Sequence, residues 1–313
     1  MHPALSIVFF TTASGCGFAL LALIGIAVPL GLLPQSAGFG FTTLAVATVL
    51  AVAGLASSML HLGRPERAWR AFSQWKTSWL SREGVLSVLT FAPAAVFGLG
   101  WLVFGNTGGL VGLCGILAAV MAVGTIYCTG MIYASLKPIR QWNNGWVVPN
   151  YFALGLMGGL LLLDLIVRFW IPWPIAIPVL ALIVIAAAWG FKERYWRFID
   201  ITAAPSNVAS ATGLGQRGKV RMLEPPNTEE NYLLKEMGFR IARKHRLRLR
   251  LITRLTAFLV PMLATFASLF TPVGLIAAAV AVLSAALGLV IERWLFFAEA
   301  KHTVMLYYGA EIV

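Results

Sequence analysis

A histidine and a glutamate flank a short basic segment that separates two apolar stretches of the chain. His61 follows an apolar stretch of roughly 20 residues, the length that crosses a bilayer, and Glu83 opens the next one. Because consecutive spans joined by a short loop leave and re-enter the same membrane face, both side chains must lie at that face. An imidazole and a carboxylate can exchange protons near neutral pH. We therefore predict that His61 and Glu83 form a catalytic pair for a membrane-dissolved ligand that carries protons.

Basic side chains follow the histidine at helical spacing. Arg64, Arg67 and Arg70 recur every third residue and would favour an anionic oxygen nearby. A quinone meets these requirements because its two-electron redox chemistry requires two protons, and Glu83 could accept the proton released. The alternative is a basic interfacial segment in which the histidine only caps a helix.

Two tyrosines in a later span extend this candidate site. Tyr127 and Tyr133 lie in the last turns of the stretch 108–136, at about the depth of His61. Each could donate a hydrogen bond to a carbonyl oxygen, although aromatic belts are common at membrane interfaces. The predicted quinone-binding residues are His61, Arg64, Glu83, Tyr127 and Tyr133.

Four charged residues stand in or beside apolar stretches, where burial is costly and a functional role is the default expectation. Asp164 and Arg168 are four residues apart on one helix face, and the alternative to a functional role is a self-paired couple. Glu292 and Glu299 are seven residues apart, hence on one face of the last span, and could face the bundle interior. We predict that these four side chains take part in a proton route.

The composition identifies the class of protein that must position these residues. The chain has 313 residues, of which 59% are hydrophobic and 12% charged, whereas a soluble domain averages about 25% charged. We therefore predict an all-α integral membrane protein, a bundle of eight transmembrane helices in a single membrane domain, residues 1–313. The predicted spans are roughly 4–33, 40–60, 84–104, 108–136, 149–170, 172–191, 251–270 and 272–298.

The basic residues predict the orientation of the bundle. The loops 61–83, 137–148 and 192–250 share one side and hold 20 of the 24 Lys and Arg residues. The positive-inside rule places these loops and both termini in the cytoplasm, and we expect a bacterial inner membrane. The formal net charge of +12 follows from this topology, so it does not indicate a nucleic-acid partner.

The loop 192–250 forms a long cytoplasmic arm. It contains a Pro-Pro step and a predicted helix from about Thr228 to Arg250. This helix either lies on the lipid interface or docks a soluble partner. The arm also matches G-x-G-x-x-G at 213–218, but no strand precedes the pattern and no helix follows it. We therefore assign the pattern to a flexible loop rather than to phosphate binding.

No metal centre is expected within this protein. Cys16, Cys114 and Cys128 lie inside spans without the spacing of a cluster motif. The four histidines lie at or beyond the ends of spans, whereas a membrane haem normally needs two at matching depth on facing helices. We therefore predict no haem, no iron–sulfur cluster and no molybdenum in the protein.

The residues around the candidate pair resemble the dimethyl sulfoxide reductase membrane-anchor family, which is related to the polysulfide reductase-type anchors. The resemblance rests on the segments 58–63 (S-M-L-H-L-G), 80–83 (L-S-x-E) and 292–302. It implies a haem-free anchor that exchanges electrons between a pool of ubiquinone or menaquinone and a four-cluster, ferredoxin-like iron–sulfur subunit. That subunit would serve a molybdopterin catalytic subunit. By position, His61 and Glu83 match the quinone-site histidine and acid of the family.

The long arm and the predicted cytoplasmic face indicate which members of this family the sequence resembles most. A complex facing the cytoplasm resembles the membrane-bound sulfite dehydrogenases, which would feed electrons from sulfite into quinone. The first alternative is the anchor of a reductase for dimethyl sulfoxide or another S- or N-oxide, which would oxidise quinol. The second is a proton-coupled transporter that uses Asp164 and Arg168, although the sequence shows no clear inverted repeat. Besides soluble subunits, membrane lipids are expected partners.

Overall fold

The computed structural model describes residues 4–60, 62, 64–202, 206–221, 223–224, 245–270 and 273–308. Within them, eight helical segments are long and apolar enough to cross a membrane, and no strand is present. The predicted all-α bundle of eight spans is thus confirmed. The spans are α1 (Leu5–Ala27), α2 (Ala37–Met59), α3 (Trp79–Phe104), α4 (Gly109–Ala134), α5 (Val147–Val167), α6 (Ala176–Ile201), a seventh made of α10 (Arg246–Thr253), η3 (Arg254–Leu259) and α11 (Val260–Ala267), and α12 (Gly274–Ala298).

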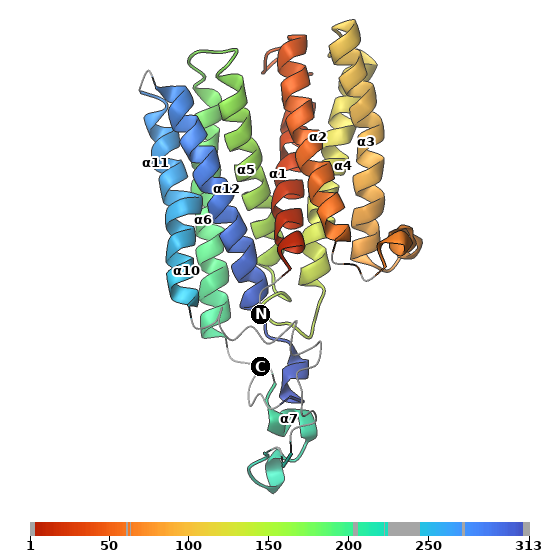
Figure 1. Ribbon diagram of the computed structural model, residues 1–313, viewed down its shortest axis with the longest axis vertical. Coiled ribbons are helices and arrows are strands. Elements are labelled where there is room, and N and C mark those ends of the chain that lie inside the picture. Colours follow the sequence, from red (N-terminus) through yellow and green to blue (C-terminus); the bar gives the residue numbers. More distant parts are fainter. Residues whose placement is uncertain are drawn as a thin grey trace.

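Two helices form the centre of the bundle. α1 packs against α2, α4 and α5, and α5 packs in turn against α6 and α12. Figure 1 shows α1 to α4 on one side of the bundle and α5, α6, α11 and α12 on the other. In the central segments of α1 and α5, 72% and 78% of the residues are buried, against 28–39% in the other six spans. These two helices carry the core, whereas the outer helices leave a face toward lipid.

Small residues allow the central helices to approach closely. A Cβ atom added at Gly25 of α1 would lie 2.5 Å from the carbonyl oxygen of Gly115 in α4. A Cβ atom added at Gly17 would lie 2.7 Å from the carbonyl oxygen of Ala47 in α2. Such contacts leave no room for a side chain, and small residues are the usual basis of helix association in lipid. They bring the backbone of α1 into close contact with α4 and with α2.

Capping fixes the start of α3, the helix that carries the candidate carboxylate. The hydroxyl of Ser78 accepts a hydrogen bond from the Ser81 N–H at 3.4 Å. At the other end of α3, Gly105 adopts a φ of +63°, the left-handed conformation in which helices commonly end. The capped start places Glu83 in the second turn of α3.

Two spans extend further than the sequence predicts. Residues 192–201 were expected in the arm, but α6 continues through them to Ile201. The seventh span likewise begins earlier than predicted, at Arg246. Lys192 and Arg250 give these turns a polar composition, yet both side chains are buried and paired with carboxylates. Charge pairing within the bundle therefore lengthens both helices.

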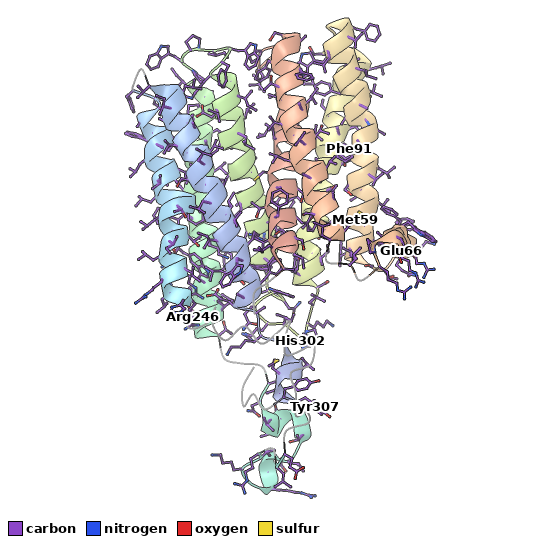
Figure 2. The ribbon with its side chains drawn as sticks, in the orientation of Figure 1. Met59, Glu66, Phe91, Arg246, His302 and Tyr307 are labelled. Carbon is purple, nitrogen blue, oxygen red and sulfur yellow. The ribbon has the colours of Figure 1, made fainter. Side chains whose placement is uncertain are left out.

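Short elements gather at one end of the bundle, which we call the arm end. It carries the connections after α2, α4 and α6 and the segment after α12. Figure 2 shows Arg246 at this end and His302 and Tyr307 beyond it. Most of the helix predicted up to Arg250 lies outside the described residues, and its last part is α10. The short elements are η1 (Pro65–Gln74) beside α3, and α7 (Val208–Thr212), η2 (Gly215–Arg217) and η4 (Thr303–Leu306), which project beyond the bundle (Figure 1).

Candidate functional site

Glu83 is the centre of the candidate site. Its side chain is 3% exposed, and its Oε1 atom is hydrogen-bonded to the hydroxyl of Thr129 in α4. Thr129 Oγ1 also lies 3.0 Å from the carbonyl oxygen of Thr125, although a hydroxyl has only one proton to donate. The hydroxyl can donate to an ionised Glu83, or it can donate to the carbonyl and accept the proton of a neutral Glu83. The contact therefore accommodates both protonation states of the carboxyl.

An aromatic pair stands within about one turn of Glu83. Trp79 and Tyr127 pack edge to face, with ring centroids 5.7 Å apart. Arg82 lies over the Trp79 ring, 4.3 Å from its centroid. Tyr127 is 40% exposed, so its ring faces the surroundings of the bundle. The pair provides an apolar aromatic surface against which a planar ring can pack.

The basic segment before α3 is tied to the same turn. Arg82 donates hydrogen bonds to the carbonyl oxygens of Trp75 (3.0 Å) and Lys76 (2.7 Å), just after η1. Arg64 precedes η1 and is exposed, so its guanidinium is accessible to an anionic group. His61 lies outside the described residues, and its place in the site stays a prediction.

Tyr133 faces the interior rather than this surface. It follows Tyr127 by six residues on α4, a rotation of about 240° around the helix. Its ring stacks on Tyr151 at 5.8 Å and lies edge-on against Phe296 and Phe297 at 5.5 and 5.3 Å. The structure therefore separates the two tyrosines predicted as quinone ligands, with Tyr133 in a buried aromatic cluster.

Asp164 and Arg168 form a buried pair at the end of the bundle opposite the arm end. Arg168 Nη2 lies 3.0 Å from Asp164 Oδ1, and it also donates to the hydroxyl of Ser268 at 2.8 Å. The couple thus pairs with itself and ties α5 to the turn after α11. Gly274 lies against Arg168, and the rise along α12 from Gly274 to Glu292 is roughly 27 Å. The four residues predicted for a proton route are therefore not brought together.

Glu292 belongs to a buried cluster of three charges. Its carboxylate oxygens are paired with Lys192 Nζ of α6 and with Arg293 Nε, the latter at 2.5 Å. All three side chains are buried, with Glu292 at 0% exposure. Lys192 Nζ also lies 4.2 Å from the centroid of the Tyr195 ring. Sequence reasoning gave neither cation a role in the site, although a signal was present, because a cation in or beside an apolar stretch needs a partner of opposite charge.

Glu299 belongs to a second ion cluster, closer to the arm end. Its Oε1 accepts a hydrogen bond from Arg250 Nε at 2.7 Å, and Arg250 Nη1 lies 2.5 Å from Asp200 Oδ2. Burial raises the pKa of the Glu299 carboxyl above its ordinary value, and Arg250 opposes that rise. The Asp200 side chain is 36% exposed, so this cluster reaches the surface.

Comparison with known proteins identifies the class to which this bundle belongs. The family described as DMSO reductase anchor subunit (DmsC) matches residues 1–309. Because the match covers nearly the whole sequence, the chain belongs to this family. It is therefore a membrane anchor subunit of a DMSO reductase-type oxidoreductase complex. Membership in this family favours the anchor prediction over the transporter alternative.

Two curated relatives narrow the comparison. A sulfite dehydrogenase subunit of Allochromatium vinosum is 32% identical over 331 residues, which cover 98% of this protein and 99% of that subunit. An anaerobic dimethyl sulfoxide reductase subunit of Escherichia coli is 32% identical over 117 residues, which cover 36% of this protein and 40% of that subunit. No solved structure matches the sequence. The similarity extends over the full length only for the first of these two relatives.

Proposed function

We propose that this protein is the quinone-reactive anchor of a complex that oxidises sulfite and reduces ubiquinone or menaquinone. The observation that carries the proposal is the buried Glu83, which is bonded to Thr129 and lies close to the partly exposed aromatic pair of Trp79 and Tyr127. The choice of sulfite rests on the similarity to the sulfite dehydrogenase subunit over 98% of the sequence.

The residues of the site fit a quinone headgroup. Trp79 and Tyr127 offer an aromatic surface for a planar ring, and Glu83 offers a carboxyl that can hold or release a proton. Quinone reduction consumes two electrons and two protons and forms one O–H bond at each ring oxygen. His61 would hydrogen-bond one ring oxygen, Arg64 would favour negative charge there, and Glu83 would supply the protons.

The electrons come from partner subunits in this proposal. Oxidation of sulfite to sulfate with water releases two electrons and two protons, a reaction that we assign to a molybdopterin catalytic subunit. A ferredoxin-like iron–sulfur subunit would carry the electrons to the anchor. It must dock at the arm end, because Glu83 lies in the second turn of α3 from that end.

The projecting elements at the arm end offer a docking surface for the iron–sulfur subunit. The segments containing α7, η2 and η4 enclose a groove of about 950 Å³ together with Pro138. Lys219 and Arg221 contribute positive charge to this largely apolar lining. Tyr307 also lines the groove and lies well beyond the bundle (Figure 2). An apolar surface with basic groups suits a partner that presents apolar and acidic residues.

The same end would face the bacterial cytoplasm. The loops at this end carry most of the Lys and Arg residues of the protein, the pattern of the cytoplasmic side of an inner membrane. Sulfite oxidation would then take place in the cytoplasm, with lipid surrounding the outer faces of the eight spans.

Sulfite-dependent reduction of decylubiquinone by the purified complex tests the proposal. We expect the anchor to co-purify with an iron–sulfur protein and molybdenum, and the wild-type complex to turn over. Replacement of Glu83 by Gln, or of His61 by Ala, should lower quinone turnover by about 10²-fold or more, because each removes a proton-transfer group. Reduction of the iron–sulfur subunit by sulfite should persist in both variants. Normal quinone kinetics in the Glu83 variant would contradict the assignment.

The S-oxide reductase alternative is supported by the partial similarity to a dimethyl sulfoxide reductase subunit over 36% of the sequence. The same preparation distinguishes the two functions. Oxidation of a quinol by dimethyl sulfoxide without any sulfite-dependent activity would favour this alternative, and it would leave the roles of His61 and Glu83 in place.

A further inference from the structure

A row of polar side chains starts at Glu83 and crosses the interior of the bundle. Thr129, which is bonded to Glu83, also lines a small cavity between α1, α4, α5 and α12. The cavity has a volume of about 20 Å³, and roughly 10–15 Å³ is enough for one water molecule. Ser14, Tyr151 and Arg293 contribute polar groups to its wall.

Two buried polar atoms, from residues that line this cavity, could hydrogen-bond to a water molecule in it. The hydroxyl oxygen of Tyr151 and the Nη1 atom of Arg293 are buried. The two side chains interact with each other, but neither atom makes a well-formed hydrogen bond to a described residue. The Arg293 guanidinium lies over the Tyr151 ring, 4.2 Å from its centroid. A buried water needs two to four polar partners. One water would therefore join Thr129, Tyr151 and Arg293 in a single hydrogen-bonded network.

Beyond Arg293 the row continues through the buried charge cluster. Arg293 is bonded to Glu292, which is paired with Lys192 on the neighbouring helix α6. The Tyr195 hydroxyl has no well-formed hydrogen bond to a described residue, and it interacts electrostatically with Glu292 and with Glu299. Glu299 Oε2 is likewise buried without a bond to a described residue. The Tyr195 hydroxyl is therefore a buried polar group that can link the two carboxylates.

The row reaches the surface through the second ion cluster. Arg250 is bonded to Glu299 through Nε and to Asp200 through Nη1 and Nη2. The Asp200 side chain is 36% exposed at the end of α6, close to Arg246. Figure 2 shows Arg246, the first residue of α10, at the arm end and away from the α3 side of the bundle.

We infer that this row is a proton route that connects the arm-end surface at Asp200 with Glu83 at the quinone site. The inference rests on the proposed function, because only a reaction that consumes protons at Glu83 requires their resupply. The carboxyls of Glu299, Glu292 and Glu83 carry the proton. Arg250 and Arg293 keep their charges and hold these carboxyls in position.

The number of protons that enter the route equals the number that leave it. For each quinone reduced, two protons leave Glu83 one after the other, and two protons enter at Asp200. Every transfer breaks one O–H or N–H bond and forms another, so each carrier returns to its starting state. Between the carboxyls, the proton passes through the Lys192 amine, the Tyr151 and Tyr195 hydroxyls and the intervening water. The two electrons arrive separately from the iron–sulfur subunit.

A purely structural role accounts less well for the row. The desolvation cost of two buried charges often exceeds their attraction, and apolar residues of similar size often hold two helices together equally well. Ionisable groups within spans are rare for this reason and mark proton relays when they occur. Four of the ten buried side-chain atoms that lack a well-formed hydrogen bond among the described residues belong to Tyr151, Tyr195, Arg293 and Glu299. Such a concentration fits a water-assisted path.

The test uses the assembled complex in membranes, with reduced benzyl viologen as electron donor and decylubiquinone as acceptor. This donor makes the outcome independent of the physiological substrate. Turnover per assembled complex is measured at about pH 6 and pH 8, in light and heavy water. The variants are Glu292→Gln, which removes a carrier, and Tyr151→Phe, which removes one hydroxyl with little change of shape. Glu193→Gln is the matched control, because Glu193 neighbours Lys192 but pairs with Arg254 at the partly exposed face of α6.

Both route variants should lose about tenfold or more at pH 8, where protons are scarce, and much less at pH 6. Their turnover should also slow further in heavy water, whereas the control should keep the wild-type pH profile. Wild-type pH profiles and isotope effects in both route variants would overturn the route while leaving the quinone site intact. A lower yield of complex with unchanged turnover per complex would overturn it as well, since that result indicates a structural role. Absence of quinone reduction in the wild-type complex would instead refute the proposed function itself.

Discussion

The imidazole of His302 accepts a hydrogen bond through Nδ1, so this nitrogen carries no proton and the ring is uncharged. Its Nδ1 atom accepts from the Val304 N–H at 2.9 Å and so caps η4. The backbone of His302 also forms a bridge with Ile139 in the connection after α4. Burial lowers the pKa of His302 below its usual 6.5. The uncharged side chain thus orders the start of the projecting segment, which backbone hydrogen bonds hold against the connection after α4.

Acidification should loosen this segment. Protonation puts a hydrogen on Nδ1 and removes the acceptor, so the contribution of His302 is complete above pH 6.5 and is lost as the pH falls through the lowered pKa. We expect faster amide hydrogen exchange in residues 303–308 at about pH 5 than at pH 7.5, after correction for the intrinsic rate. His302→Asn is the control, because its amide oxygen can cap η4 without titrating. Equal pH dependence in both proteins would contradict this prediction.

At the scale of single residues, sequence reasoning could find the carboxylates but not their partners. Glu83 and Glu292 are conspicuous because charge is rare in apolar stretches, and the structure places each beside a polar partner. Thr129 and Tyr151 have no such signal, since threonine and tyrosine occur in many spans. Their position next to the cavity depends on which faces of α4 and α5 meet α1, and that packing is a property of the whole bundle.

At the scale of elements, ion pairs act as clamps between helices. Arg168 ties α5 to the turn after α11 through Ser268, and Arg254 ties the seventh span to Glu193 of α6. These clamps also explain the errors in the predicted helix ends. A hydropathy pattern reads Lys192 as the start of a soluble loop, but a lysine paired with a buried carboxylate can stand inside a helix bundle.

The contribution of the Asp164–Arg168 pair to stability can be tested by replacing one partner and then both. Arg168→Leu leaves Asp164 as a buried charge without its partner and should destabilise the protein by about 3–5 kcal/mol. The double variant with Asp164→Leu as well should recover most of that loss, because apolar side chains can replace a buried pair. Thermal unfolding of the complex in detergent measures both effects. A double variant that is stable but slow in quinone turnover would instead support the predicted role of this pair in proton transfer.

At the scale of the whole molecule, the projecting elements set where soluble partners can bind. Reversal of charge in the groove, by Lys219→Glu with Arg221→Glu, should weaken the attachment of the iron–sulfur subunit, because both cations line the groove. Deletion of residues 206–227 should release that subunit from membranes and leave the eight spans inserted. Washing membranes at increasing salt and assaying bound iron measures both effects. Lys76→Glu, a single charge reversal beside η1, is the control for each of the two substitutions made singly. Undiminished binding in the deletion would contradict the docking assignment.

The location of Glu83 near the arm end has a consequence for energy conservation. The docking groove, Glu83 and Asp200 all lie at that end, and among the described residues the opposite half of the bundle holds no charged side chain besides Asp164 and Arg168. With the proposed chemistry, the protons released from sulfite and those taken up by quinone would belong to the same compartment, and the electrons would not cross the bilayer either. Turnover would then be electroneutral. The complex would store its free energy as quinol, and a membrane potential would arise only when another enzyme reoxidises that quinol.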